Sequence, residues 1–186
     1  MTMKKAAIFF ATGYEEIEAL TVVDLLRRAK IEATCVAIDN AKTVTGSHNI
    51  TVVMDAGIDE IDFDSFDILV CPGGMPGTKK LEACQKLTEH IQQFYDNKKL
   101  VAAICAAPSI FGHMGLVKGK KACIYSGMEA ELEGAEVMYD KVVRTENVIT
   151  SRGMGTAIAF GLEIIAALLD RETADQLGKT VVYTGA

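Results

Sequence analysis

Short apolar runs alternate along the chain with longer segments whose apolar residues recur at helical spacing. The apolar runs predict buried strands, and the segments between them predict amphipathic helices. We expect strands at 5–10, 33–38, 67–71, 100–104 and 148–151, and helices at 15–29, 80–95, 155–169 and 171–177, with one more beginning near Pro108. Strands that alternate with helices predict a mostly parallel sheet covered on both faces, which is the α/β class.

Weaker patterns fill the remaining segments. The Thr12–Glu15 stretch has the spacing of a capping box, with Glu15 three residues after Thr12. We expect a hairpin at 43–54 around Gly46–Asn49, a short strand at 121–125, a short helix at 128–132 and a strand at 137–143. No repeat or linker divides the chain, so 1–186 is expected to form one domain.

Composition narrows the class of protein. The chain has 186 residues, 49% of them hydrophobic and 24% charged, which is ordinary for a globular protein. Its net charge of −6 argues against nucleic acid or an anionic membrane as a partner. The N-terminal residues lead directly into a strand without the pattern of a signal peptide, and no apolar run is long enough to cross a membrane. We therefore expect a cytoplasmic protein.

The cysteines and histidines do not suggest a metal site. The cysteines are odd in number and widely spaced, which argues against both a disulfide framework and a zinc site. They lie at positions 35, 71, 84, 105 and 123, and the histidines at 48, 90 and 113. The histidines show no metal-ligand spacing with one another or with a carboxylate.

Cys105 stands where a buried strand meets a helix. The apolar run 100–104 comes directly before it, and Pro108 fits the first turn of the helix that follows. Backbone N–H groups at a helix N-terminus favour a thiolate, so we expect a reactive cysteine with a lowered pKa. The alternative is that Cys105 is a small, inert core residue.

Glu18 falls on the apolar side of the first predicted helix. At about 100° per residue it lies between the directions of Leu25 and Ala29. Burial there raises the pKa of a carboxyl group, which predicts a protonated acid beside the cysteine. The alternative is a carboxylate that bends to water and is stabilised by the helix dipole.

The segment Cys71–Gly77 is a glycine-rich turn after a buried strand. Adjacent glycines can turn their backbone N–H groups into a site. Three interpretations stay open: a phosphate cradle, an oxyanion hole formed by the N–H groups of Gly74 and Ala106, or simply a tight strand-to-helix connection.

Three motifs together resemble one family. Ala11–Glu18, Pro72–Gly74 and Ala103–Pro108 are similar to the ThiJ/PfpI superfamily, and within it to the branch of the parkinsonism-associated protein deglycase, a glutathione-independent glyoxalase. The segment Thr150–Thr156 resembles a later motif of that branch. The resemblance implies a flavodoxin-like three-layer α/β/α sandwich with the cysteine at a nucleophile elbow, a homodimer, and no metal or organic cofactor.

The resemblance also implies roles for individual residues. Cys105 corresponds to the reactive cysteine and Glu18 to its protonated partner, and the backbone donors fall in the glycine turn at Gly73 and Gly74 and at Ala106. Arg28 corresponds to an arginine of an anion-accepting rim.

At four positions the chain departs from relatives in that superfamily. Ala106 stands where the protease-like branch carries His, which removes support for a Cys-His protease. Tyr125 stands where animal members carry His, and a tyrosine is the poorer base at neutral pH. His48 lies near a position that can be Arg, and Met154 replaces a proline.

The expected function is cofactor-free conversion of 2-oxoaldehydes such as methylglyoxal and glyoxal to 2-hydroxy acids, or removal of their early adducts with amines and thiols. The partner is then a small aldehyde or a glycated amine or thiol. The alternatives are a redox sensor or chaperone-like protective protein that works through oxidation of Cys105, a cysteine hydrolase, and a flavin-binding electron carrier.

Overall fold

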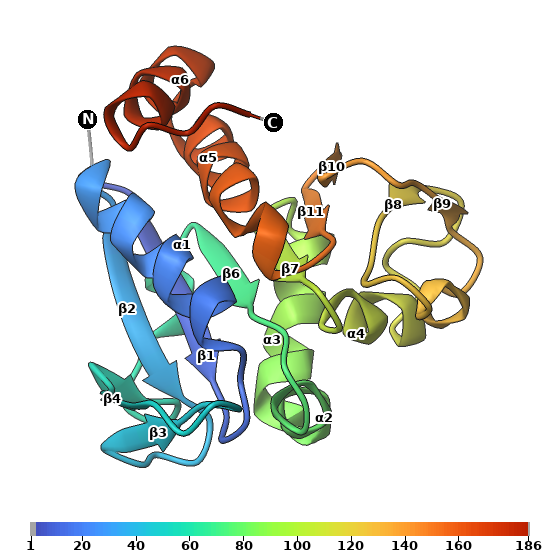
Figure 1. The fold of residues 1–186 in the computed structure, drawn as a ribbon. Coiled ribbons are helices and arrows are strands. Elements are labelled where there is room, and N and C mark those ends of the chain that lie inside the picture. The colour runs from blue at the N-terminus through green and yellow to red at the C-terminus, as the bar shows by residue number, and fades with distance from the viewer. Residues whose placement is uncertain (1–2, 186) are drawn as a thin grey trace.

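The computed structural model describes residues 3–185 and is built around a seven-stranded sheet (Figure 1). The strand order is β10-β11-β7-β6-β1-β2-β5, and every neighbouring pair is parallel except the edge pair β10 and β11. The strands span β1 Lys5–Phe10, β2 Glu32–Ala37, β5 Ala56–Gly57, β6 Ile68–Cys71, β7 Leu100–Ile104, β10 Val142–Thr145 and β11 Val148–Ser151.

Helices cover both faces of this sheet. One face packs against α1 (Glu16–Arg28), α5 (Ala157–Leu168) and α6 (Arg171–Thr180), and the other against α2 (Gly77–Ala83), α3 (Gln85–Asp96) and α4 (Pro108–His113). Alternate residues of β1 enter opposite cores: Ile8 lies with the first group of helices and Phe9 with the second. The predicted flavodoxin-like α/β/α sandwich is thereby confirmed.

Two small additions flank the sandwich (Figure 1). The strands β3 (Thr43–Thr45) and β4 (Thr51–Val53) form the predicted hairpin. A longer segment, residues 114–141, connects α4 to β10, and we call it the excursion. It contains β8 (Lys121–Ala122), the 3-10 turn η2 (Glu129–Glu131) and β9 (Glu136–Val137). Short 3-10 turns also occur at η1 (Phe63–Ser65) and η3 (Met154–Thr156).

Three local predictions are wrong. The Thr12 side chain caps no helix, because Thr12 and Gly13 form a turn and α1 begins only at Glu16. The predicted helix 80–95 is two helices, since the backbone of Cys84 is extended, with ψ 92°, between α2 and α3. The predicted strand 137–143 is divided between β9 and β10, which belong to different sheets.

The helices are short relative to a bilayer. Among the described residues, none of them is long and apolar enough to cross a membrane.

The excursion is packed closely on α4 at Gly112. A Cβ atom built on Gly112 would lie 1.9 Å from the carbonyl oxygen of Glu131, a backbone atom that cannot move alone. Helix propensity by itself favours alanine over glycine by about 1 kcal/mol. The close contact with Glu131 outweighs the helix propensity, so glycine is favoured over alanine at position 112.

We therefore expect Gly112→Ala to lower the free energy of unfolding by about 1–3 kcal/mol, because the added methyl group pushes the excursion off α4. Urea unfolding followed by circular dichroism measures this. Gly155→Ala is the matched control, since the space around that position is open. Equal stabilities of the two variants would contradict the close packing.

Candidate active site

Cys105 follows β7 directly at the carboxyl edge of the sheet. Its φ of +66° lies in the left-handed region, which a residue with a side chain rarely adopts. Neighbouring segments hold this conformation: the Cys105 N–H donates to the Ser151 carbonyl at 3.0 Å, and its carbonyl accepts from the Tyr125 N–H at 2.9 Å. The predicted strand, sharp turn and helix are all present, and the thiol is half-buried above the turn.

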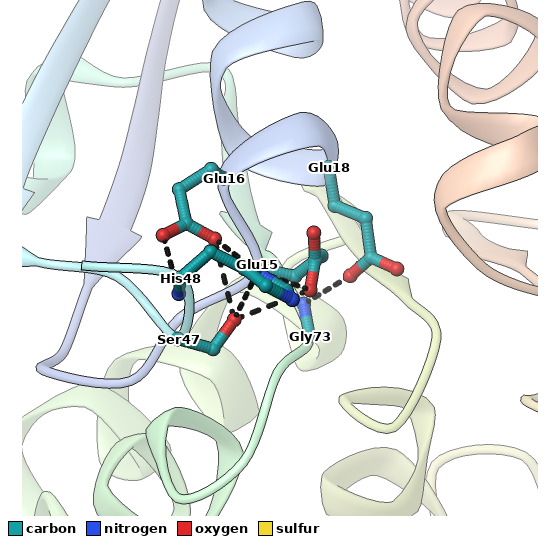
Figure 2. A network of polar contacts seen from close by, with 6 residues as sticks. All are labelled: Glu15, Glu16, Glu18, Ser47, His48 and Gly73. Atoms are coloured by element: carbon teal, nitrogen blue, oxygen red, sulfur yellow. Dashed lines mark hydrogen bonds and ion pairs between the residues drawn. The ribbon is translucent and has the colours of Figure 1, made fainter. Parts of the chain in front are cut away.

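Glu18 reaches the same point from the first turn of α1. Its side chain is buried, with 1% of the residue exposed, and its Oε2 accepts a hydrogen bond from the Gly73 N–H at 2.9 Å (Figure 2). Its carboxyl group is also hydrogen-bonded to the thiol of Cys105. The alternative of a carboxylate bent to water is therefore wrong.

The glycine turn fits between these two side chains. A Cβ atom on Gly73 would lie 2.5 Å from Oε2 of Glu18 and 2.6 Å from Cβ of Cys105, so only glycine fits there. Gly74 has a φ of +91°, and its N–H and that of Ala106 face the sulfur. Because Gly73 donates to a carboxyl group and Gly74 to a thiol, this arrangement suits an oxyanion hole better than a phosphate cradle.

Both acidic groups have a raised pKa. Burial raises the pKa of Glu18 to about 7, against the opposing effect of hydrogen bonds from Cys105 and from the backbone of Gly73. Burial, the negative charge of Glu18 and the hydrogen bond to it raise the pKa of Cys105 to about 12, against the two N–H groups that lower it. The expected low pKa of the thiol is wrong for this pair: at neutral pH it carries at most one negative charge.

Two more residues border the site. A Cβ atom on Gly153, just after β11, would lie 3.4 Å from the ring of Tyr125 and 4.0 Å from Oε1 of Glu18. Tyr125 is half exposed, so its ring forms an accessible wall. Gly153 was not among the expected site residues, although the Thr150–Thr156 motif contains it.

Arg28 does not join this cluster within the chain. It lies ten residues beyond Glu18 on α1, about 15 Å along the helix axis, and pairs with Asp24 at 2.6 Å. The sequence placed both residues on one helix, but the two ends of a helix of this length cannot serve one small site.

A second polar cluster lies beside the first. Figure 2 shows Glu16 pointing away from Glu18, toward the hairpin loop that carries Ser47 and His48. Glu16 accepts hydrogen bonds from the His48 N–H at 2.7 Å and from Nδ1 at 2.9 Å. Burial raises the pKa of Glu16, but these and other backbone hydrogen bonds outweigh it and lower the pKa to about 2.

No metal-ligand spacing in the sequence links His48 to a carboxylate, but the fold brings it to Glu15 and Glu16. One ligand atom each from Glu15, Glu16 and His48 lies within 4.8 Å of the others, close enough for a metal ion. The same atoms already bind one another, because His48 pairs with both glutamates. The hydrogen bond to Glu16 and the charges of both glutamates raise the pKa of His48. The cluster ties the hairpin to the start of α1.

The other cysteines do not take part in the Glu18–Cys105 pair. Cys35, Cys71 and Cys123 are buried, and Cys84 is half-buried at the break between α2 and α3. All of the cysteines are free thiols.

Comparison with known proteins connects this geometry to a family. The model of the DJ-1/PfpI family matches residues 4–167. Protein DJ-1 homolog A of Arabidopsis thaliana is 39% identical over 169 residues, which are 90% of this chain but 43% of that protein. The chain thus spans about two fifths of the length of this relative and of Protein DJ-1 homolog B from the same plant.

Other relatives match over nearly their whole length. Glutathione-independent glyoxalase DJR-1.2 of Caenorhabditis elegans is 32% identical over 166 residues, 89% of this chain and 88% of that protein. The solved structure of oxidized Toxoplasma gondii DJ-1 superposes with a TM-score of 0.93 at 30% identity, over 97% of this chain and 99% of that one. On the sequence match and the shared fold, this chain belongs to the DJ-1/PfpI family.

Proposed function

We propose that this protein converts 2-oxoaldehydes such as methylglyoxal to 2-hydroxy acids, with Cys105 as the nucleophile and Glu18 as the proton carrier. The observation that supports this most is the hydrogen-bonded pair of a half-buried thiol and a buried carboxyl group at one strand end. A relative that is 32% identical is named a glutathione-independent glyoxalase.

The first step uses the shared proton. The Glu18 carboxylate takes the proton from the thiol as the sulfur attacks the aldehyde carbon, and a pKa of about 7 suits a base that works near neutral pH. The aldehyde oxygen becomes an oxyanion beside the N–H groups of Gly74 and Ala106, which face the sulfur. Protonation of that oxygen by Glu18 completes a hemithioacetal and restores the carboxylate.

The second step moves two protons through Glu18. The carboxylate removes the hydrogen of the former aldehyde carbon and delivers it to the neighbouring carbonyl oxygen, which gives an enediol. It then takes the proton of the former aldehyde's hydroxyl group and delivers it to the neighbouring carbon. The product is a thioester of a 2-hydroxy acid, and water hydrolyses it to the free acid and the thiol. The net reaction adds one water molecule to the oxoaldehyde and gives the 2-hydroxy acid, so it consumes no oxidant or reductant. The same attack would open early adducts of these aldehydes with amines or thiols.

A second candidate function is peroxide sensing. The sulfur of Cys105 has a base at hydrogen-bond distance and two backbone N–H groups aimed at it, an arrangement that also stabilises an oxidised sulfur with negative oxygens. The described relative from Toxoplasma gondii is a DJ-1 solved in an oxidized form. Peroxide would convert the thiolate to a sulfenate with release of water, and a second peroxide would give the sulfinate.

The enzyme proposal predicts that Cys105→Ala and Glu18→Ala each lower methylglyoxal turnover at least about 100-fold, since each removes a group that makes or moves a bond. The assay measures lactate formed without glutathione. Cys84→Ala is the matched control, because that half-buried thiol lies outside the site. Unchanged turnover in both site variants would exclude this mechanism.

The coupling of the pair predicts a lower thiol pKa in Glu18→Gln. The substitution removes the negative charge that helps raise the pKa of Cys105 to about 12, so thiolate appears at lower pH than in the wild type. Thiolate absorbance against pH measures this, with Cys105→Ser as the blank. An equal or higher pKa in the variant would show that the carboxylate does not act on the thiol.

Peroxide sensing predicts a selective reaction. Mild peroxide should add two oxygens chiefly to Cys105, as measured by mass spectrometry of the digested protein, while buried Cys35, Cys71 and Cys123 stay reduced. Glu18→Ala should speed the reaction near neutral pH, because loss of the carboxylate charge lowers the pKa of the Cys105 thiol and leaves more thiolate. Oxidation spread evenly over all cysteines would count against a sensor.

A further inference from the structure

Arg152 stands next to Cys105 at the carboxyl edge of the sheet. Strands β7 and β11 run parallel and end opposite each other, at Ile104 and Ser151. Cys105 is the first residue after β7, and Arg152 is the first residue after β11. The Cys105 N–H donates to the Ser151 carbonyl, so the pairing of the two strands reaches the site itself. Adjacent strands lie about 4.8 Å apart, which places the two backbones side by side.

In the strand order β11-β7-β6-β1, Arg152 follows the strand on one side of β7, and α1 follows β1 on the other side. The guanidinium donates to Oγ of Ser126 at 2.5 Å and to the carbonyl of Tyr139 at 3.3 Å, and it lies 5.5 Å from the centre of the Tyr139 ring. Ser126 follows Tyr125, whose ring borders the site at Gly153. The guanidinium is therefore bound to the residue next to the wall that Tyr125 forms.

This arginine is unusual in having no acidic partner. The other arginines each pair with a carboxylate: Arg27 with Asp55, Arg28 with Asp24, and Arg144 and Arg171 with Glu163. Arg152 forms no ion pair with any residue between 3 and 185. Its side chain contacts a hydroxyl group, a carbonyl and a ring, and its charge opposes the burial that raises the pKa of the Cys123 thiol. A guanidinium has five N–H donors in a fork that matches a carboxylate.

We propose that Arg152 is a substrate-binding residue that receives a carboxylate at the far end of a 2-oxoaldehyde. This inference rests on the proposed function and defines its substrate class: oxoaldehydes with an acidic tail. The aldehyde lies at Cys105, and the tail extends past Tyr125 to the guanidinium.

The charges around the site support this direction. On the α1 side, Glu15, Glu16 and Glu18 repel an anion, and the positive charge of His48 is neutralised by its bonded glutamate. On the opposite side Arg152 is half-buried and has a free part of its donor fork. An acidic tail therefore has one favourable orientation, with its aldehyde end toward the thiol.

The kinetic test compares two substrates that share a reactive end. The compound 4,5-dioxopentanoate is a 2-oxoaldehyde with a terminal carboxylate, and methylglyoxal lacks the carboxylate. We expect Arg152→Met to lower the ratio of kcat/KM for 4,5-dioxopentanoate to that for methylglyoxal about tenfold or more, chiefly through KM. Arg171→Met, which removes an arginine remote from Cys105, should leave the ratio unchanged. An unchanged ratio in Arg152→Met would overturn the inference.

A second measurement does not depend on turnover. N-iodoacetyl-β-alanine and its terminal amide both alkylate a thiol with loss of iodide, and they differ in charge only at the far end of the tail. We expect the ratio of their rates at Cys105, followed by mass spectrometry, to fall severalfold in Arg152→Met and to stay constant in Arg171→Met. A ratio equal to wild type would overturn the anion site.

The two measurements separate the inference from the proposed function. Loss of the preference for the carboxylate-tailed reagent in Arg152→Met, with no lactate formed by the wild type, would remove the enzyme proposal and retain an anion site near Cys105. Lactate formation that requires Cys105, with both ratios unaffected in Arg152→Met, would retain the enzyme and remove the anion site.

Discussion

A carboxyl group and a thiol that are buried side by side cannot both be charged at neutral pH, and the whole site is built around this constraint. Glu18 comes from the helix after β1 and Cys105 from the turn after β7, so their contact depends on the pairing of β1, β6 and β7. Gly73 permits the contact because any side chain there would overlap both groups. The shared proton is thus a property of the tertiary fold and not of either segment.

The backbone at Cys105 is the second requirement. A left-handed conformation costs a residue with a side chain about 1–2 kcal/mol, and only the surrounding structure can maintain it. Here the neighbouring strand binds the N–H of Cys105 and the excursion binds its carbonyl. The strain lifts the sulfur out of the sheet toward Glu18. The excursion therefore contributes to the site twice, since it also supplies the ring of Tyr125.

The sequence predicts the parts of the site that depend on local pattern. The apolar run before Cys105 gives the strand and turn, and the helical periodicity around Glu18 identifies it as a buried carboxyl group. The periodicity gives no sign that Glu16 is buried too, and the contact of His48 with Glu16 could not be predicted, because it exists only where the hairpin folds onto α1. The prediction of a low thiol pKa was wrong because it, too, ignored contacts made only in the folded chain. The helix N-terminus predicts a lowered value, but burial and the carboxylate, which depend on packing, outweigh it.

The charges on the two sides of the site are unequal, since glutamates begin α1 and Arg152 follows β11. Under the proposed function, this difference would select among aldehydes. Methylglyoxal carries no net charge and would be oriented only through its dipole. A substrate with an acidic tail would be oriented by the charges before it reaches the sulfur, which would reduce the entropy lost in the attack. The acidic side has its own use, since the glutamates around the thiol disfavour a second negative charge and keep one proton on the pair. A positive group placed beside Cys105 would attract anions more strongly, but it would also remove the proton that Glu18 must carry. An arginine displaced to the outer rim meets both requirements.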